Sequence, residues 1–88
     1  MRKIRIVREF KRDLKKVKRR GKSLVKLDKI VGMLLRNKKL GDKYRIHKLQ
    51  GNYSNKLECH IEPDWLLIYE LNEDYLTLYR TGSHADLF

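Results

Sequence analysis

The sequence has one cysteine and no long apolar run. Cys59 has no partner for an internal disulfide, and its place on the apolar side of a predicted strand indicates a small buried side chain rather than a nucleophile. The longest apolar stretch, residues 65–69, is far too short to cross a bilayer. The basic N-terminus lacks the apolar segment of a signal peptide. We therefore expect a soluble, cytoplasmic protein with no membrane segment.

Acidic residues are also scarce. The chain has 11 Asp and Glu against 22 Lys and Arg, which gives a formal net charge of +11. An excess this large favours a polyanionic partner such as RNA, DNA, an anionic membrane or an acidic protein. Ordinary solvation of helix surfaces is the alternative explanation. At 88 residues, 41% of them hydrophobic, the chain can build one modest core, so we predict a single domain over residues 1–88.

The hydrophobic periodicity divides the chain into elements. Residues 3–7 alternate as a strand, and residues 9–20 show helical spacing among many cations. Gly21 suits the end of that helix, and Ser23 suits the start of a second helix over residues 24–35. Further strands are expected over residues 44–49, 56–62, 65–72 and 75–80. We predict an α+β fold of order β-α-α-β-β-β, in which a helical hairpin covers one face of a mostly antiparallel sheet.

The central hairpin brings polar groups to the edge of the core. Pro63 and Asp64 suit a tight turn between two strands. Polar residues alternate with apolar ones before the turn, whereas residues 65–69 are apolar throughout, as in a strand buried on both faces. His60 and Asp64 therefore lie beside Trp65. The polar residues expected to line the open sheet face are His47, Lys48, His60 and Arg80.

Three histidines next to predicted strands are candidates for acid–base chemistry. RNA cleavage without a metal needs a base for the 2′-hydroxyl, an acid for the departing 5′-oxygen and a cation for the phosphate. His47, His60 and His84, with Asp64, can serve the first two needs, and Arg80 or a lysine the third. Composition alone leaves a purely structural role for the histidines open. No H-x-x-x-H or C-x-x-C spacing is present, so we predict no metal and no cofactor.

Two motifs carry a family resemblance. The H-x-E-P-D-W run at residues 60–65 and the R-T-G-S-H-A-D-L-F ending at residues 80–88 resemble the YafQ branch of the RelE/ParE toxin superfamily, and residues 47–51 are also similar. The likeness covers most of the chain, although the helical half matches only in pattern. It implies a RelE-like fold and a type II toxin: a small endoribonuclease that cuts mRNA, typically on the translating ribosome, and is silenced by a cognate antitoxin.

The resemblance also implies roles for individual residues. His84 matches the central acid–base position, and Arg80 would hold the scissile phosphate. Trp65 and Phe88 would help to form the RNA pocket by stacking on bases. Glu58 stands where the family has an aspartate, which leaves its contribution undefined. The other implied active-site residues are His47, His60 and Asp64.

Two other functions compete with the nuclease. ParE relatives share the scaffold but act on DNA gyrase without this histidine set, so a non-catalytic basic toxin or nucleic-acid-binding module is the main alternative. A DNA-binding regulator is less well supported, because no helix-turn-helix pattern is evident. The nuclease reading predicts an acidic, partly disordered antitoxin and contacts between the cations of the first helix and ribosomal RNA phosphates.

Overall fold

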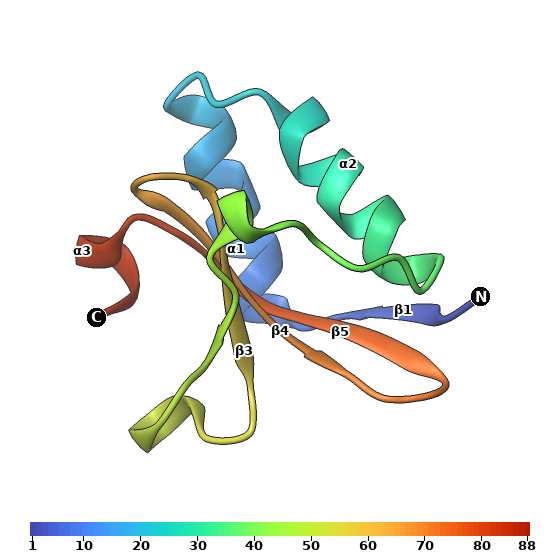
Figure 1. Cartoon of the computed structure of the whole chain (residues 1–88). Coiled ribbons are helices and arrows are strands. Elements are labelled where there is room, and N and C mark those ends of the chain that lie inside the picture. Colours follow the sequence, from blue (N-terminus) through green and yellow to red (C-terminus); the bar gives the residue numbers. More distant parts are fainter.

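A sheet of five strands carries two helices on one face (Figure 1). The computed structural model describes residues 1–88. The strands are β1 (Lys3–Ile6), β2 (His47–Lys48), β3 (Leu57–Glu62), β4 (Trp65–Leu71) and β5 (Tyr75–Gly82). The helices are α1 (Arg8–Arg19), α2 (Leu24–Leu35) and the short α3 (His84–Leu87), with 3-10 turns at Asp42–Tyr44 and Gly51–Tyr53. No helix has the length and apolar character needed to span a membrane.

The strand order is β1-β5-β4-β3-β2, with β1 and β2 at the edges. β1 runs parallel to β5, and the other three pairings are antiparallel. The parallel pair arises because the chain crosses over through α1 and α2 before it re-enters the sheet. The predicted α+β fold, with a helical hairpin on a mostly antiparallel sheet, is confirmed.

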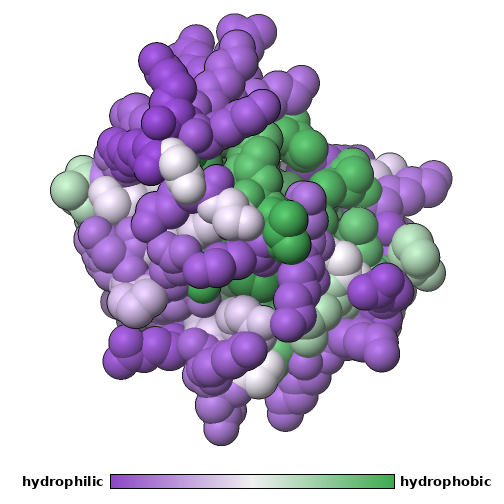
Figure 2. All heavy atoms as spheres, turned by 90° about the horizontal axis from the view of Figure 1, so that it is seen from above, coloured by the Kyte–Doolittle hydropathy of each residue, from purple (hydrophilic) through white to green (hydrophobic).

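The main core lies between the helices and the sheet. α1 buries Phe10 and Val17, and α2 buries Ile30 and Leu34, against inward side chains of β3, β4 and β5. Gly21 has φ 84°, the left-handed conformation that a tight turn between the helices requires. Figure 2 views the molecule from the helical side and shows hydrophilic side chains over most of this face, around a hydrophobic strip. The charged residues of the two long helices face solvent, as the helical spacing predicts, with the exception of the buried Asp13.

A smaller apolar cluster lies on the opposite face of the sheet. Leu66 and Ile68 of β4 pack there against Leu87 of α3, with Tyr53 and Tyr79 beside them. Residues 65–69 are consequently buried on both faces, and none is more than 1% exposed. This confirms the prediction of a two-sided central strand. α3 and the Gly51–Tyr53 turn cover only part of this face, which leaves room for polar residues.

The structure differs from the predicted elements at two places. The strand expected over residues 44–49 is reduced to His47–Lys48, because residues 42–44 form a 3-10 turn and Arg45 takes a left-handed φ of 50°. The last strand continues to Gly82, and residues 84–87 form α3 rather than a tail. α3 begins in a capping box, in which the Ser83 side chain accepts from the Asp86 N–H.

Candidate active site

The three imidazoles converge on the open sheet face, although they come from three different elements. His47 belongs to β2, His60 to β3, and His84 is the first residue of α3. The ring centres of His47 and His60 are 6.3 Å apart, and those of His60 and His84 are 5.8 Å apart. The three rings therefore form a continuous row in which His60 is the middle member.

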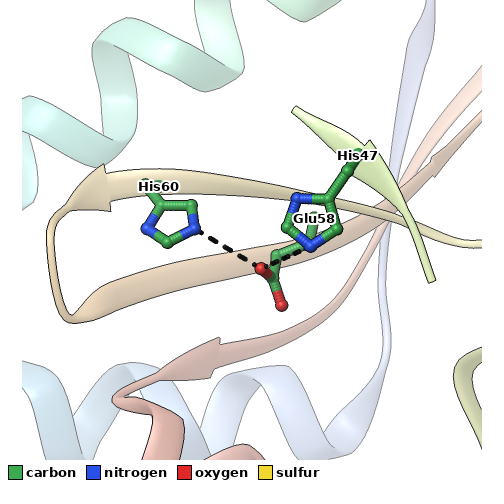
Figure 3. Close-up of side chains that lie close together, drawn as sticks. All are labelled: His47, Glu58 and His60. Atoms are coloured by element: carbon green, nitrogen blue, oxygen red, sulfur yellow. Dashed lines mark ion pairs between the residues drawn. The ribbon is translucent and has the colours of Figure 1, made fainter. Parts of the chain in front are cut away.

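A buried carboxylate joins the first two rings. Glu58 is 3% exposed and pairs with His47 across the β2–β3 ladder. Its Oε1 lies 3.0 Å from His47 Nε2 and 3.5 Å from His60 Nε2 (Figure 3). Glu58 and His60 are two residues apart on one strand, so they share a face. We refer to His47, Glu58 and His60 as the Glu58 trio.

The other ring nitrogens of the trio face backbone carbonyls. His47 Nδ1 is 3.1 Å from the Arg45 carbonyl oxygen, and His60 Nδ1 is 3.3 Å from that of Pro63. A carbonyl can only accept, so each Nδ1 carries the proton and each Nε2 is directed at Glu58. The backbone and Glu58 together fix the orientation of both rings.

His84 is oriented by a second carboxylate. Asp64, in the β3–β4 turn, places its Oδ1 2.8 Å from the His84 backbone nitrogen and 2.6 Å from His84 Nδ1. These two hydrogen bonds, the backbone one first, lower the pKa of Asp64 below its usual value. With Nδ1 engaged, Nε2 of His84 stays free, and the side chain is 54% exposed. The ring can therefore exchange a proton with a ligand in solvent.

Arg80 is already paired within the fold. Its Nε donates to Asp13 Oδ2 at 2.6 Å and its Nη2 to Asp13 Oδ1 at 3.2 Å, while Nη1 lies 3.2 Å from the Tyr53 hydroxyl. These contacts with Asp13 raise the pKa of Arg80. The Arg80 side chain remains 28% exposed. A phosphate that binds Arg80 must therefore share the guanidinium with Asp13.

Two residues predicted to contact RNA do not lie on the open sheet face, and the prediction that Lys48 lines that face is wrong. Trp65 is 1% exposed and its Nε1 donates to Thr81 Oγ1 at 2.9 Å, so no RNA base can stack on the ring. The cause is strand alternation, which puts Trp65 on the helix side with Leu67. Lys48 lies opposite Leu57, which packs on the same helix-side core. Lys48 therefore belongs to the other face from its neighbour His47.

Phe88, the other aromatic residue predicted to contact RNA, lies on the surface. The ring is 64% exposed and meets the Tyr53 ring edge-on, with centres 5.6 Å apart and an interplanar angle of 79°. Tyr53 also contacts Arg80, so the Phe88 ring adjoins the polar end of β5. An exposed aromatic ring held by a second ring is available for stacking on a base.

Comparison with known proteins decides the family. The family model described as "Bacterial toxin of type II toxin-antitoxin system, YafQ" matches residues 2–88. The chain belongs to this toxin family. The Escherichia coli K12 protein named mRNA interferase toxin YafQ is 38% identical over 81 residues, which are 91% of this chain and 88% of that protein.

Two solved structures extend the likeness to the whole chain. The YafQ-family toxin superposes on a chain of the E. coli DinJ–YafQ complex with a TM-score of 0.92 and 37% identity, covering 100% of this chain and 99% of that one. A metal-bound toxin from Helicobacter pylori gives a TM-score of 0.91 and 40% identity, with 100% of both chains covered. The predicted family is thus confirmed.

The Glu58 trio of this YafQ-family toxin has the donor set of a metal site. Its two imidazole nitrogens and one carboxylate oxygen all lie within 4.8 Å of one another. Nitrogen and carboxylate ligands in this combination suit Zn²⁺ or Cu²⁺. The residues therefore fit a metal, contrary to what the sequence spacing indicates. Strand pairing, rather than spacing along the chain, brings them together.

Sequence reasoning assigned no role to three carboxylates that orient the site. Glu58 joins two histidines, Asp13 of α1 binds Arg80, and Asp86 caps α3. Only Glu58 gave a usable signal, because it alternates with His60 on one strand. Asp13 was hidden in a run of cations, and its partner lies 67 residues away along the chain.

Proposed function

We propose that this toxin is an mRNA interferase that cuts RNA by metal-independent acid–base catalysis at the row of three histidines. The observation that carries the proposal is the convergence of His47, His60 and His84 on one face, with centres 6.3 and 5.8 Å apart and a carboxylate beside each end of the row. Three rings at this spacing can surround a single phosphodiester. The name of the E. coli relative, mRNA interferase toxin, supports RNA as the substrate.

His84 is the residue that exchanges the proton in this proposal. Asp64 holds its Nδ1–H at 2.6 Å, and Nε2 is left exposed toward the substrate. The carboxylate holds this exposed ring in one orientation, so His84 suits the acid that protonates the departing 5′-oxygen. Asp64 itself acts through His84 and fixes the ring orientation, as the carboxylate of a catalytic triad does.

His47 and His60 supply positive charge and the remaining proton transfer. In the reaction, the 2′-hydroxyl loses its proton to a base, its oxygen attacks phosphorus, and the bond to the 5′-oxygen breaks. The products are a 2′,3′-cyclic phosphate and a free 5′-hydroxyl. Two imidazoles at the same carboxylate can stabilise the phosphorane charge while one of them accepts the 2′ proton. The proposal does not assign that proton to His47 or to His60.

A metal in the Glu58 trio would change this arrangement. A bound Zn²⁺ or Cu²⁺ would act as a Lewis acid toward a phosphoryl oxygen. It would be held by the imidazoles of His47 and His60 and by the Glu58 carboxylate. The proposed mechanism uses no metal, so a chelator should leave the cleavage rate unchanged.

RNA binding is proposed to use charge around the site together with one aromatic ring. Arg80, whose side chain is 28% exposed, offers its guanidinium to a phosphate, and Phe88 offers a stacking surface. The solvent face of α1 carries Lys15, Lys18 and Arg19 around a shallow hollow. Their charge suits ribosomal RNA phosphates, so we propose that cleavage takes place on the ribosome.

The proposed protein partner is an acidic antitoxin. The related E. coli toxin was solved in the DinJ–YafQ complex, described as a toxin–antitoxin complex. A net charge of +11 on this chain favours a negatively charged partner segment. We expect the affinity of the pair to fall as salt is raised from 50 to 500 mM, since exposed charge pairs are screened. An affinity that does not change over this range would contradict an electrostatic interface.

The test is cleavage of a translated message, mapped by primer extension. His84→Ala should reduce the cleavage rate about 10²- to 10⁴-fold, the usual contribution of a general acid or base. Ala85→Ser, at the next exposed position of α3, is the matched control and should cut like the parent. Equal cleavage by the parent and His84→Ala would refute the assignment. Growth inhibition that survives triple histidine substitution, without RNA cleavage, would instead favour a non-catalytic toxin.

A further inference from the structure

An ion pair ties the end of α1 to the short helix that carries His84. Arg20, the C-cap residue of α1, places Nη1 2.5 Å from Asp86 Oδ2 and Nη2 2.9 Å from Asp86 Oδ1. This is the two-pronged geometry in which a guanidinium holds a carboxylate most firmly. Arg20 thereby differs from Lys16, Lys18 and Arg19 in the last turn of α1, which make no ion pair. Its partner lies two residues after His84.

Asp86 is also hydrogen-bonded to Ser83, the residue before His84. Asp86 Oδ2 accepts the Ser83 N–H at 2.9 Å, and Ser83 Oγ accepts the Asp86 N–H at 3.2 Å. The carboxylate lies so close to the chain that a Cβ built on Gly82 would stand 2.8 Å from Asp86 Oδ2. Arg20 and Ser83 lower the pKa of Asp86. Ser83 and Asp86 thus flank His84 on both sides within one hydrogen-bonded unit.

α3 needs such restraints because it is only four residues long. A helix this short has no stability of its own in water. Asp64 holds the His84 side chain from the β3–β4 turn, and Leu87 anchors the far end in the apolar cluster. The Arg20 contact is the link from α3 to α1. Without it, the first turn of α3 can shift while Leu87 stays buried.

We propose that the Arg20–Asp86 ion pair is a positioning device for His84, which sets where the imidazole meets the scissile phosphodiester. The inference rests on the proposed function, in which His84 exchanges the proton. Arg20 and Asp86 are positioning residues and do not touch the reacting atoms. A displacement of about 1 Å at a reacting group is enough to cost about 100-fold in rate, so a loose α3 would slow the chemical step.

Direct contact of Arg20 with RNA is the competing explanation. A hollow of about 230 Å³ lies between the end of α1 and the start of α3, lined among others by Arg20, Lys22, Asp64 and Ser83. A phosphate in this hollow would meet Arg20 itself. The two explanations differ in their kinetics, because a lost phosphate contact raises KM whereas a misplaced His84 lowers kcat.

The experiment measures steady-state cleavage of a ribosome-bound message by the full chain and its variants. We expect Arg20→Met to lower kcat about 10- to 100-fold with KM changed less than twofold. Arg20→Lys keeps the charge and should recover part of the loss, and Asp86→Asn should resemble Arg20→Met. The double variant Arg20→Met/Asp86→Asn should be no slower than the slower single variant, because both changes break the same contact. Lys39→Met removes one exposed cation elsewhere and should cut at the parental rate.

Nuclear magnetic resonance gives a readout that a general loss of stability would not produce. The imidazole signals of His84 should shift or broaden in Arg20→Met, while those of His47 and His60 stay in place. Fluorescence of Trp65, 1% exposed in the core, shows whether each variant is folded. Parental kcat in Arg20→Met, a raised KM alone, or additive losses in the double variant would each overturn the inference. Parental cleavage by His84→Ala would instead refute the proposed function.

Discussion

Replacing Asp13 tests the link between helix α1 and strand β5, and it should separate folding from RNA binding. Asp13 is 7% exposed and accepts three hydrogen bonds: two from Arg80, at 2.6 and 3.2 Å, and one from the Thr81 N–H at 3.1 Å. Asp13→Ala leaves the Thr81 N–H buried without a partner, which costs about 1–3 kcal/mol. Arg80 can turn toward water once Asp13 is removed. The cost of breaking this ion pair is therefore smaller than the roughly 3–5 kcal/mol that breaking a fully buried pair costs.

We therefore expect Asp13→Ala to lower the free energy of unfolding by about 3 kcal/mol and Asp13→Asn, which keeps one acceptor oxygen, by about 1.5 kcal/mol. Urea unfolding followed by Trp65 fluorescence measures both values. With an m-value of about 1.5 kcal/mol/M, the Asp13→Ala midpoint should fall by about 2 M. Asp28→Asn, an exposed acid on α2, is the control and should unfold like the parent.

Asp13→Asn should bind RNA more tightly than the parent although it is less stable. Asp13→Asn releases a guanidinium that the parent shares between Asp13 and the ligand. On 2′-O-methyl RNA, which lacks the nucleophile, the log–log slope of affinity against salt should steepen by about 0.7, the contribution of one phosphate contact to a single strand. Unchanged stability in both Asp13 variants would refute the account of the α1–β5 link. Weaker RNA binding in Asp13→Asn would refute the competition for Arg80.

Four further outcomes follow from the structure. Gly82→Ala should destabilise the fold by about 2 kcal/mol in thermal unfolding, since the added Cβ would stand 2.8 Å from Asp86 Oδ2. The control Gly41→Ala places its Cβ where no atom lies within 4 Å, and it should have little effect. Burial raises the pKa of the Cys59 thiol to about 12, so iodoacetamide should label it at pH 8 only after urea unfolding. Because the pKa of Asp86 is lowered, its ion pair with Arg20 stabilises the fold fully above about pH 5, and this stabilisation is lost as the pH falls through the folded-state pKa. Arg20→Met should therefore lower the melting temperature at pH 6 and much less at pH 2. Added Zn²⁺ or Cu²⁺ should inhibit RNA cleavage by occupying the Glu58 trio, and EDTA should restore it; activation by either ion would contradict the metal-independent mechanism.

Local patterns of the sequence determined the fold. Helical spacing and the unbroken apolar run at 65–69 each report the surroundings of one element, and the structure confirms them. The alternation of residues 57–62 correctly predicted a strand, but not that Glu58 on its polar face is buried. The turn at Pro63 and Asp64 and the cap at Gly21 are equally local, since φ/ψ preferences belong to single residues. The H-x-E-P-D-W and R-T-G-S-H motifs were sufficient for the family, which the comparisons confirm.

The site depended on contacts between segments far apart in the chain, and only the tertiary structure could show them. Glu58 lies beside His47 because β2 pairs with β3. Trp65 is buried in the core, away from the site, because its side chain lies on the face of β4 that the helices cover. The partners Arg20 and Asp86 are separated by 66 positions. Ion pairs of this kind leave no periodic trace in a sequence, because any acid and any base can form them once the fold has brought them together.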